Sequence, residues 1–287
     1  MARGLAAVLP PDDLTVVVNV GDDDRIHGVH VAADLDTVLY TLAGIEGPHG
    51  WGIAGDTFEA MEALDRLGHD TTFRLGDRDL ATCLTRTMAL DAGTPLGAAT
   101  ADIARALGVE HTVLPVTDGP VRTRIRTTDG EWLDFQEYFV IRRHRDEVAE
   151  VDYEGADAAK PAPGVIAAIE GAEQVIIAPS NPPLSIWPIL AVPGVRGAVA
   201  AASRVIAVSP LFGGKALKGP ADRVMASLGL PPGNEGVAAA YEGLLTDLVI
   251  DRSDAADEIE GVKVHAMDTR IADPDAATAF AARVLAL

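Results

Sequence analysis

The stretch Val16–Asp24, which reads VVVNVGDDD, predicts the fold that the rest of the chain follows. Its β-branched apolar run has the length of a strand covered by helices on both faces, and it stops at Gly21. Five carboxylates then fall within fifteen residues: Asp22, Asp23, Asp24, Asp34 and Asp36. Because ligands of open α/β sheets bind beyond the carboxyl ends of the strands, the stretch predicts a site there. A solvated acidic turn is the alternative.

Composition excludes several classes of function. The 287 residues include 43 acidic and 23 basic side chains, which gives a net charge of −20. A basic surface for nucleic acid or for an anionic membrane is therefore not expected. A single cysteine, Cys83, rules out a disulfide framework, and we expect it to be a packed thiol. The sequence has no apolar run long enough to span a bilayer and no evident signal-peptide cleavage site, so we expect a cytoplasmic protein.

Apolar strand-like runs alternate with amphipathic helical patterns along most of the chain. The expected strands are residues 14–20, 112–117, 174–178, 204–209, 248–250 and 262–267. This alternation predicts an α/β fold with a mostly parallel, doubly wound sheet. We interpret residues 1–287 as one domain, with residues 56–155 forming an α+β insertion within it.

Polar residues gather at three expected strand-to-loop junctions. The first is the Gly21 turn, and the second is Pro179–Pro183, in which prolines flank Ser180 and Asn181. The third is a glycine- and lysine-rich loop that could cradle phosphate, with Gly213, Gly214, Lys215, Lys218 and Gly219. Parallel strands would bring all three to one sheet edge, which suits a phosphorylated substrate bridged by Mg²⁺.

Taken alone, these residue patterns indicate an enzyme or a binding protein that acts on a phosphorylated small molecule. His27 and His30 lack the helical context of a zinc pair. The Gly-x-Gly-x-x-Gly fingerprint is absent, which disfavours a nicotinamide-dependent oxidoreductase.

A series of motifs, taken in chain order, resembles one enzyme family. These motifs are Val18–Asp23, His27–Gly28, Asp34–Thr37, Tyr40–Gly44, Gly50–Gly52, Asp56–Thr57, Leu75–Thr82, Phe135–Val140, Pro161–Val165, Pro179–Pro182, Ile189–Gly194 and Lys218–Arg223. Together they resemble the 2-phospho-L-lactate transferase family of coenzyme F-420 biosynthesis, over essentially the whole chain. The resemblance implies a Rossmann-like core with an insertion.

The resemblance also implies a reaction. The terminal ribityl hydroxyl of the deazaflavin FO attacks the phosphorus next to a three-carbon acid in a guanosine-diphospho-activated donor, such as one carrying 2-phospho-L-lactate or phosphoenolpyruvate. GMP leaves, and a phosphodiester joins the acid to FO. Such chemistry needs Mg²⁺ and in-line positioning more than covalent catalysis. The expected partners are therefore these two small molecules, and the commonest oligomer symmetry suggests a homodimer.

Carried onto this sequence, the resemblance assigns roles to individual residues. Asp22 and Asp23 are the expected catalytic carboxylates, and Asp23 and Asp36 the expected metal ligands, with Asp22 and Asp34 in support. The expected substrate contacts are Asn19, Gly21, Asp34, Thr37, Trp51, Asp77, Arg78, Asp79, Ser180 and Asn181. For residues 77–79, an ion-pair cluster that holds the insertion to the core is an equal alternative.

One departure from the family pattern concerns the N-terminus. The family normally begins with a strand and a Gly-Gly-x-Gly-Gly loop, which precede the helix that Ala2–Leu5 would end. Their absence from this sequence is expected to reflect a start codon assigned too late, or else a truncated and inactive member. A nucleotide-binding or nucleotide-sugar-binding regulator of the same fold family is the alternative function.

Overall fold

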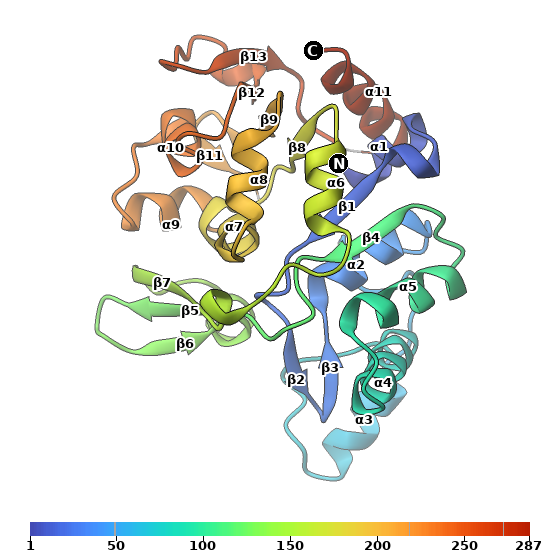
Figure 1. Cartoon of the computed structure of the whole chain (residues 1–287). Coiled ribbons are helices and arrows are strands. Elements are labelled where there is room, and N and C mark those ends of the chain that lie inside the picture. The colour runs from blue at the N-terminus through green and yellow to red at the C-terminus, as the bar shows by residue number, and fades with distance from the viewer. Residues whose placement is uncertain (49, 218, 272) are drawn as a thin grey trace.

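The chain is seen in a computed structural model that describes residues 1–48, 50–217, 219–271 and 273–287. It is an α/β fold of parallel strands flanked by helices (Figure 1). The strands are β1 Thr15–Val18, β2 Asp24–Ile26, β3 Val29–Val31, β4 Thr112–Pro115, β5 Arg122–Thr127, β6 Trp132–Asp134, β7 Val148–Glu154, β8 Val175–Ile177, β9 Val205–Val208, β10 Leu211–Phe212, β11 Lys215–Ala216, β12 Asp247–Asp251 and β13 Lys263–Met267. The α-helices are α1 Ala2–Val8, α2 Ala33–Leu42, α3 Glu59–Arg66, α4 Asp77–Asp91, α5 Leu96–Ala106, α6 Val165–Gly171, α7 Trp187–Ala191, α8 Val195–Ala201, α9 Ala221–Ser227, α10 Gly233–Ala240 and α11 Pro274–Leu285.

Four parallel strands form the main sheet, in the order β13–β12–β9–β8. Every residue of β9 and β12 is buried, as expected for strands covered on both faces. In Figure 1, α6 and α8 lie side by side next to β8 and β9. The prediction of a mostly parallel sheet wound with helices is confirmed.

A second parallel pair, β1 with β4, carries the VVVNVGDDD stretch. Within the described residues, β1 pairs with β4 and β8 pairs with β9, so the two parallel sets are not hydrogen-bonded to each other. Helix α1 joins the two parts of the molecule by packing closely on α11. A Cβ on Gly4 would lie 2.2 Å from the Ala277 carbonyl oxygen, so this approach requires glycine.

The range predicted as an insertion, residues 56–155, is only partly separate from the core. It contains α3, α4 and the antiparallel sheet β6–β5–β7, in which β5 and β6 are joined by a turn at Asp129–Gly130. However, β4 lies in the same range and pairs with β1. The sequence prediction is corrected here, because a strand of the core sheet pair comes from within this range.

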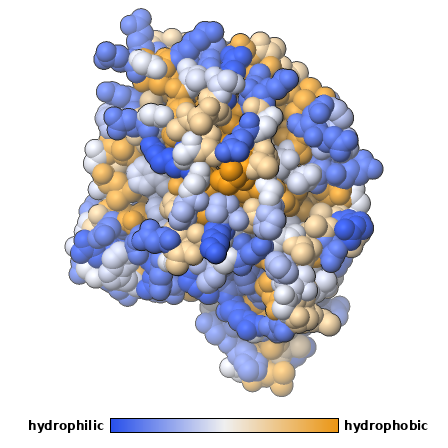
Figure 2. Space-filling view, in the orientation of Figure 1, coloured by the Kyte–Doolittle hydropathy of each residue, from blue (hydrophilic) through white to orange (hydrophobic). Residues whose placement is uncertain are grey.

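The hairpins β2–β3 and β10–β11 were not expected, since strands of two or three residues are too short to show alternation. The face seen in Figure 2 is mostly hydrophilic, with apolar residues scattered among the polar ones. In the described parts of the chain, no single helix has the length and hydropathy of a membrane span, although the bent pair Pro182–Ala191 and Val195–Ala201 meets both criteria together.

Candidate active site at the end of β1

The turn after β1 is fixed by Asn19. Its side-chain oxygen accepts the N–H of Gly21 at 2.7 Å, and its side-chain nitrogen donates to Asp34 Oδ2 at 3.1 Å. Asn19 therefore joins the turn to α2, which carries Asp34. Gly21 is needed at its position, because a Cβ there would lie 2.5 Å from Thr123 Oγ1 and 3.1 Å from Pro188 Cβ.

Two carboxylates of this turn are buried without enough partners. Asp22 and Asp23 are 4% and 9% exposed, and the Oδ1 atom of each is buried with no hydrogen-bond partner. Burial raises the pKa of Asp22 well above its usual range, and the nearby charge of Asp34 raises it further. Burial also raises the pKa of Asp23 to about 6, although a hydrogen bond from His30 opposes this change. Such unsatisfied carboxylate oxygens suit a hard cation such as Mg²⁺.

Asp36 has a different partner from the one predicted. Its two oxygens accept hydrogen bonds from the two terminal nitrogens of Arg86, a fully buried side chain on α4. A cation at Asp36 would have to compete with this guanidinium, so we reassign Asp36 from metal ligand to ion-pair partner. Among the described residues, one group of three possible metal ligands has its donor atoms within 4.8 Å of one another. It consists of Asp36, Asp79 and Cys83. Arg86 already neutralises Asp36 within that set.

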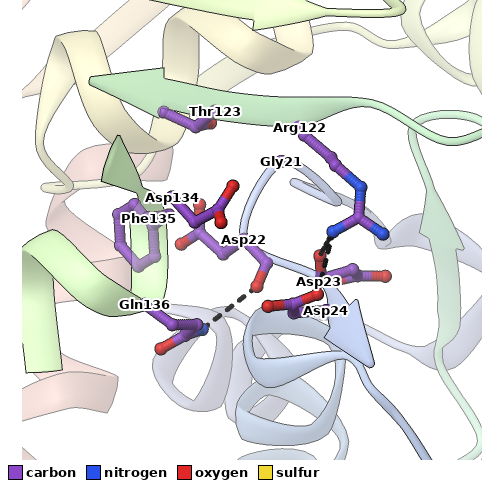
Figure 3. Close-up of a pocket in the computed structure, with 9 residues that line it drawn as sticks. All are labelled: Gly21, Asp22, Asp23, Asp24, Arg122, Thr123, Asp134, Phe135 and Gln136. Carbon is purple, nitrogen blue, oxygen red and sulfur yellow. Dashed lines mark hydrogen bonds and ion pairs between the residues drawn. The ribbon is translucent and has the colours of Figure 1, made fainter. Parts of the chain in front are cut away.

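A small cavity of about 10 Å³, with room for about one water-sized group, lies beside the Gly21 turn (Figure 3). Three segments line it: residues 21–24, Arg122 and Thr123 of β5, and residues 134–136 at the end of β6. Gln136 donates to the backbone carbonyl of Asp22 at 3.0 Å, which ties the insertion to the turn. The ring of Phe135 stacks on Phe139 with centroids 5.3 Å apart, so the pocket has an aromatic wall beside its carboxylates.

The second predicted junction, Pro179–Pro183, leads into a segment that packs on the Gly21 turn. Asn181 begins the helical turn Pro182–Ile186 by accepting the N–H of Leu184, and its own side-chain nitrogen is buried without a partner. The same segment leads to Pro188, which contacts Gly21. The segment that follows the second junction therefore lies against the Gly21 turn.

The third junction does not have the chemistry predicted for it. The N–H of Gly213 donates to Ser253 Oγ and to Asp254 Oδ2, both at 2.9 Å. Gly213 and Gly214 line a cavity of about 450 Å³ together with Glu235, Asp254, Asp257 and Glu258. Phosphate would be repelled by these carboxylates, so the phosphate-loop interpretation is corrected. Lys215 lies exposed on β11, Gly219 lies against the ring of Phe139, and Lys218 lies outside the described residues.

The Gly-Asp-Arg-Asp motif mainly holds helices together. Asp77 accepts the N–H groups of Glu59 and Ala60 at the start of α3. Arg78 donates to the Ala54 carbonyl, and Asp79 accepts the hydroxyl of Tyr40 at 2.8 Å. Of the two alternatives for these three residues, the structure favours the one that holds the insertion to the core.

The last two predicted substrate contacts, Thr37 and Trp51, differ in their exposure to solvent. Thr37 is half-buried on α2 next to Asp36, and Trp51 is 64% exposed in its glycine-rich loop. Neither lines the pocket beside Gly21.

Sequence reasoning missed His30, Arg86 and Gln136. His30 Nε2 lies 3.1 Å from Asp23 Oδ2, and His30 was considered only as a zinc ligand. Arg86 sits on the same helix face as the buried Cys83, which is the one local sign that its charge would be buried. Gln136 was part of the resemblance motif but was given no role.

Comparison with known proteins bears on this site. Residues 1–285 match the sequence model of the family described as 2-phospho-L-lactate transferase CofD. The chain belongs to this family. A phosphoenolpyruvate transferase of Streptomyces griseus is 41% identical over 99% of this chain and 93% of its own length. A 2-phospho-L-lactate transferase of Methanothermobacter thermautotrophicus is 42% identical over 89% of this chain and 82% of its own length.

Membership in the CofD family confirms the resemblance drawn from the motifs. It supports a transferase of coenzyme F-420 biosynthesis that acts on small molecules, and it does not favour the regulatory alternative. A solved UPF0052-family protein of Bacillus halodurans has the same fold, with a TM-score of 0.64 at 17% identity over 99% of this chain and 94% of its own.

Proposed function

We propose that this CofD-family chain transfers a phospho-three-carbon-acid group from a guanosine-diphospho donor to the terminal ribityl hydroxyl of FO. In this reaction a new P–O bond forms to FO, the P–O bond to GMP breaks, and the hydroxyl proton passes to a carboxylate. The names of the relatives, phosphoenolpyruvate transferase and 2-phospho-L-lactate transferase, support a three-carbon acid. The sequence identities to the phosphoenolpyruvate transferase and to the 2-phospho-L-lactate transferase are nearly equal, at 41% and 42%. The test therefore includes the guanylylated donors of both acids.

The proposed location of this reaction rests on one observation, the buried and unpartnered oxygens of Asp22 and Asp23 in the turn after β1. We assign Asp23 and Asp34 to hold Mg²⁺, and Asp22 to accept the proton from the hydroxyl of FO. The raised pKa of Asp22 makes it a stronger base than an ordinary carboxylate. When bound, Mg²⁺ would neutralise charge on the diphosphate, as phosphoryl transfer requires.

Other residues of the pocket, together with Asn181 of the second junction, would orient the substrates. Phe135 offers a flat apolar surface to the deazaflavin ring, and the unpaired amide of Asn181 offers a donor to a substrate oxygen. Arg122, which pairs with Asp24 at 2.9 Å, lines the same pocket with a positive charge.

The test is to incubate the protein with FO, Mg²⁺ and each guanylylated donor, and to follow the product by mass spectrometry. We expect one FO phosphodiester and one GMP per turnover. Asp23→Asn should lower turnover by at least about a hundredfold, since it removes a charged ligand. Asp102→Asn is the matched control, because among the described residues Asp102 pairs with Arg105 alone, on the surface. Full activity in Asp23→Asn, or no phosphodiester with either donor, would refute the proposal.

A further inference from the structure

His30 holds one oxygen of Asp23 and leaves the other free. His30 lies on β3, in the hairpin that begins directly after Asp23. Its Nε2 lies 3.1 Å from Asp23 Oδ2, and because an ionised carboxylate only accepts, Nε2 carries the proton. Asp23 Oδ1 is buried and has no partner. The bond thus fixes the rotation of the carboxylate and directs its unpartnered oxygen.

Helix α4 fixes the backbone of His30 from both sides. The N–H of His30 donates to Thr87 Oγ1 at 2.7 Å, and Arg86 Nη1 donates to the His30 carbonyl at 3.3 Å. Thr87 Oγ1 is itself anchored, since it donates to the Cys83 carbonyl at 2.7 Å. Arg86 is fully buried and paired with Asp36, so it cannot move without breaking that pair. His30 is therefore held more firmly than an ordinary residue of a two-stranded hairpin.

From this chain of contacts we infer that His30 is a positioning residue for the metal site, a role that rests on the proposed function of Asp23. His30 binds no substrate and does not ligate the cation. It keeps the free oxygen of Asp23 directed toward the site, as outer partners of metal-binding carboxylates do. Through Arg86 and Thr87, the position of Asp23 depends on α4, which lies more than fifty residues later in the sequence.

A purely structural role would give a different pattern of contacts. The side chain of His30 is only 26% exposed, so the test uses leucine and glutamine, whose side chains are close to histidine in volume and leave little space empty. Its ring contributes the hydrogen bond to Asp23, whereas the contacts with α4 come from its backbone and are kept by leucine or glutamine. Replacing the ring therefore tests the position of Asp23 with little effect on folding.

The experiment measures Mn²⁺ binding by the full chain, using electron paramagnetic resonance of free Mn²⁺ in the absence of FO and donor. We expect His30→Leu to raise the Kd for Mn²⁺ about tenfold, the usual effect of losing an outer partner. His30→Gln should restore most of the affinity, because its amide can also donate. The thermal unfolding temperature should stay close to that of the unaltered chain in both variants.

The chain offers a matched control in His265, whose Nε2 lies 2.7 Å from Asp247 Oδ1 on the main sheet. His265→Leu removes the same kind of pair away from the Gly21 turn and should leave the Kd for Mn²⁺ unchanged. If Asp23→Asn loses Mn²⁺ but His30→Leu binds it normally, the inference about His30 is wrong and the proposed site survives. If Asp23→Asn binds Mn²⁺ as well as the unaltered chain, the metal assignment fails and the role of His30 fails with it.

Discussion

At the scale of single residues, Gly21 offers the sharpest test of the turn after β1. Any side chain there would meet Thr123 Oγ1 at 2.5 Å and Pro188 Cβ at 3.1 Å, so Gly21→Ala forces the turn, β5 or the start of α7 to move. We expect a loss of about 1–3 kcal/mol in the free energy of unfolding, the usual cost of overpacking. Urea denaturation would measure it.

Gly197 provides the control for this substitution. It lies within α8, and a Cβ there would meet nothing within 4 Å. Gly197→Ala should therefore stabilise the protein by about 0.5–1 kcal/mol, since alanine favours helix. If Gly21→Ala proved equally stabilising, the close approach of Thr123 and Pro188 would not exist in solution.

Site residues could be predicted from the sequence only where they are close neighbours along the chain. Gly21, Asp22 and Asp23 lie together because they are adjacent, and Asn19 reaches them across two positions. The partners of Asp36 and Asp23 could not be read in the same way, because Arg86 is fifty residues away and His30 lies across a hairpin of three-residue strands. A charge buried by a distant helix leaves almost no sign in the local pattern.

At the scale of elements, Asp56 stabilises the start of α4 from a distant loop. Its carboxylate accepts the N–H groups of Arg78 and Asp79 at 3.0 and 3.1 Å, and Gly76 allows the approach because a Cβ there would lie 2.2 Å from Asp56 Oδ2. Asp56→Ala leaves these helix N–H groups without their partner. We expect a loss of about 1 kcal/mol in the free energy of unfolding, measured in guanidinium chloride.

Asp70 is the comparison for this element. Within the part of the chain that the structure describes, it accepts hydrogen bonds from Thr72 alone, in the loop after α3, and starts no helix. Asp70→Ala should leave the denaturation midpoint unchanged. A midpoint for Asp56→Ala equal to that of Asp70→Ala would mean that water replaces the carboxylate at the start of α4.

Most helices of the chain could be predicted, because their apolar spacing and end signals are local. The range 77–91 begins at Asp77 with an acidic first turn, and α11 begins with Asp273 as its cap, as the sequence indicates. The loop at Gly213 shows the limit of this reasoning. Its glycines were recognised as donors, but their acceptor, Asp254, comes forty-one residues later and turns a predicted anion site into an acidic cavity.

At the scale of the whole molecule, the two parallel sets of strands differ in how many neighbours each strand has. β9 lies between β8 and β12, and β12 lies between β9 and β13. Within the described residues β1 pairs with β4 alone. A parallel strand with one neighbour leaves alternate N–H groups without a strand partner, so the sheet pair that carries the site has the less protected backbone.

Amide hydrogen exchange would therefore separate the two sets. We expect the amides of β9 and β12 to exchange most slowly, because both strands are buried throughout and paired on both sides. Those amides of β1 that point away from β4 should exchange at least about a hundredfold faster at the same pH and temperature. The amides of β1 that bond to β4 serve as the internal control, since they share the same strand. If both kinds of β1 amide exchanged as slowly as β9, the open edge of β1 would be covered in solution by another segment or a second copy of the chain.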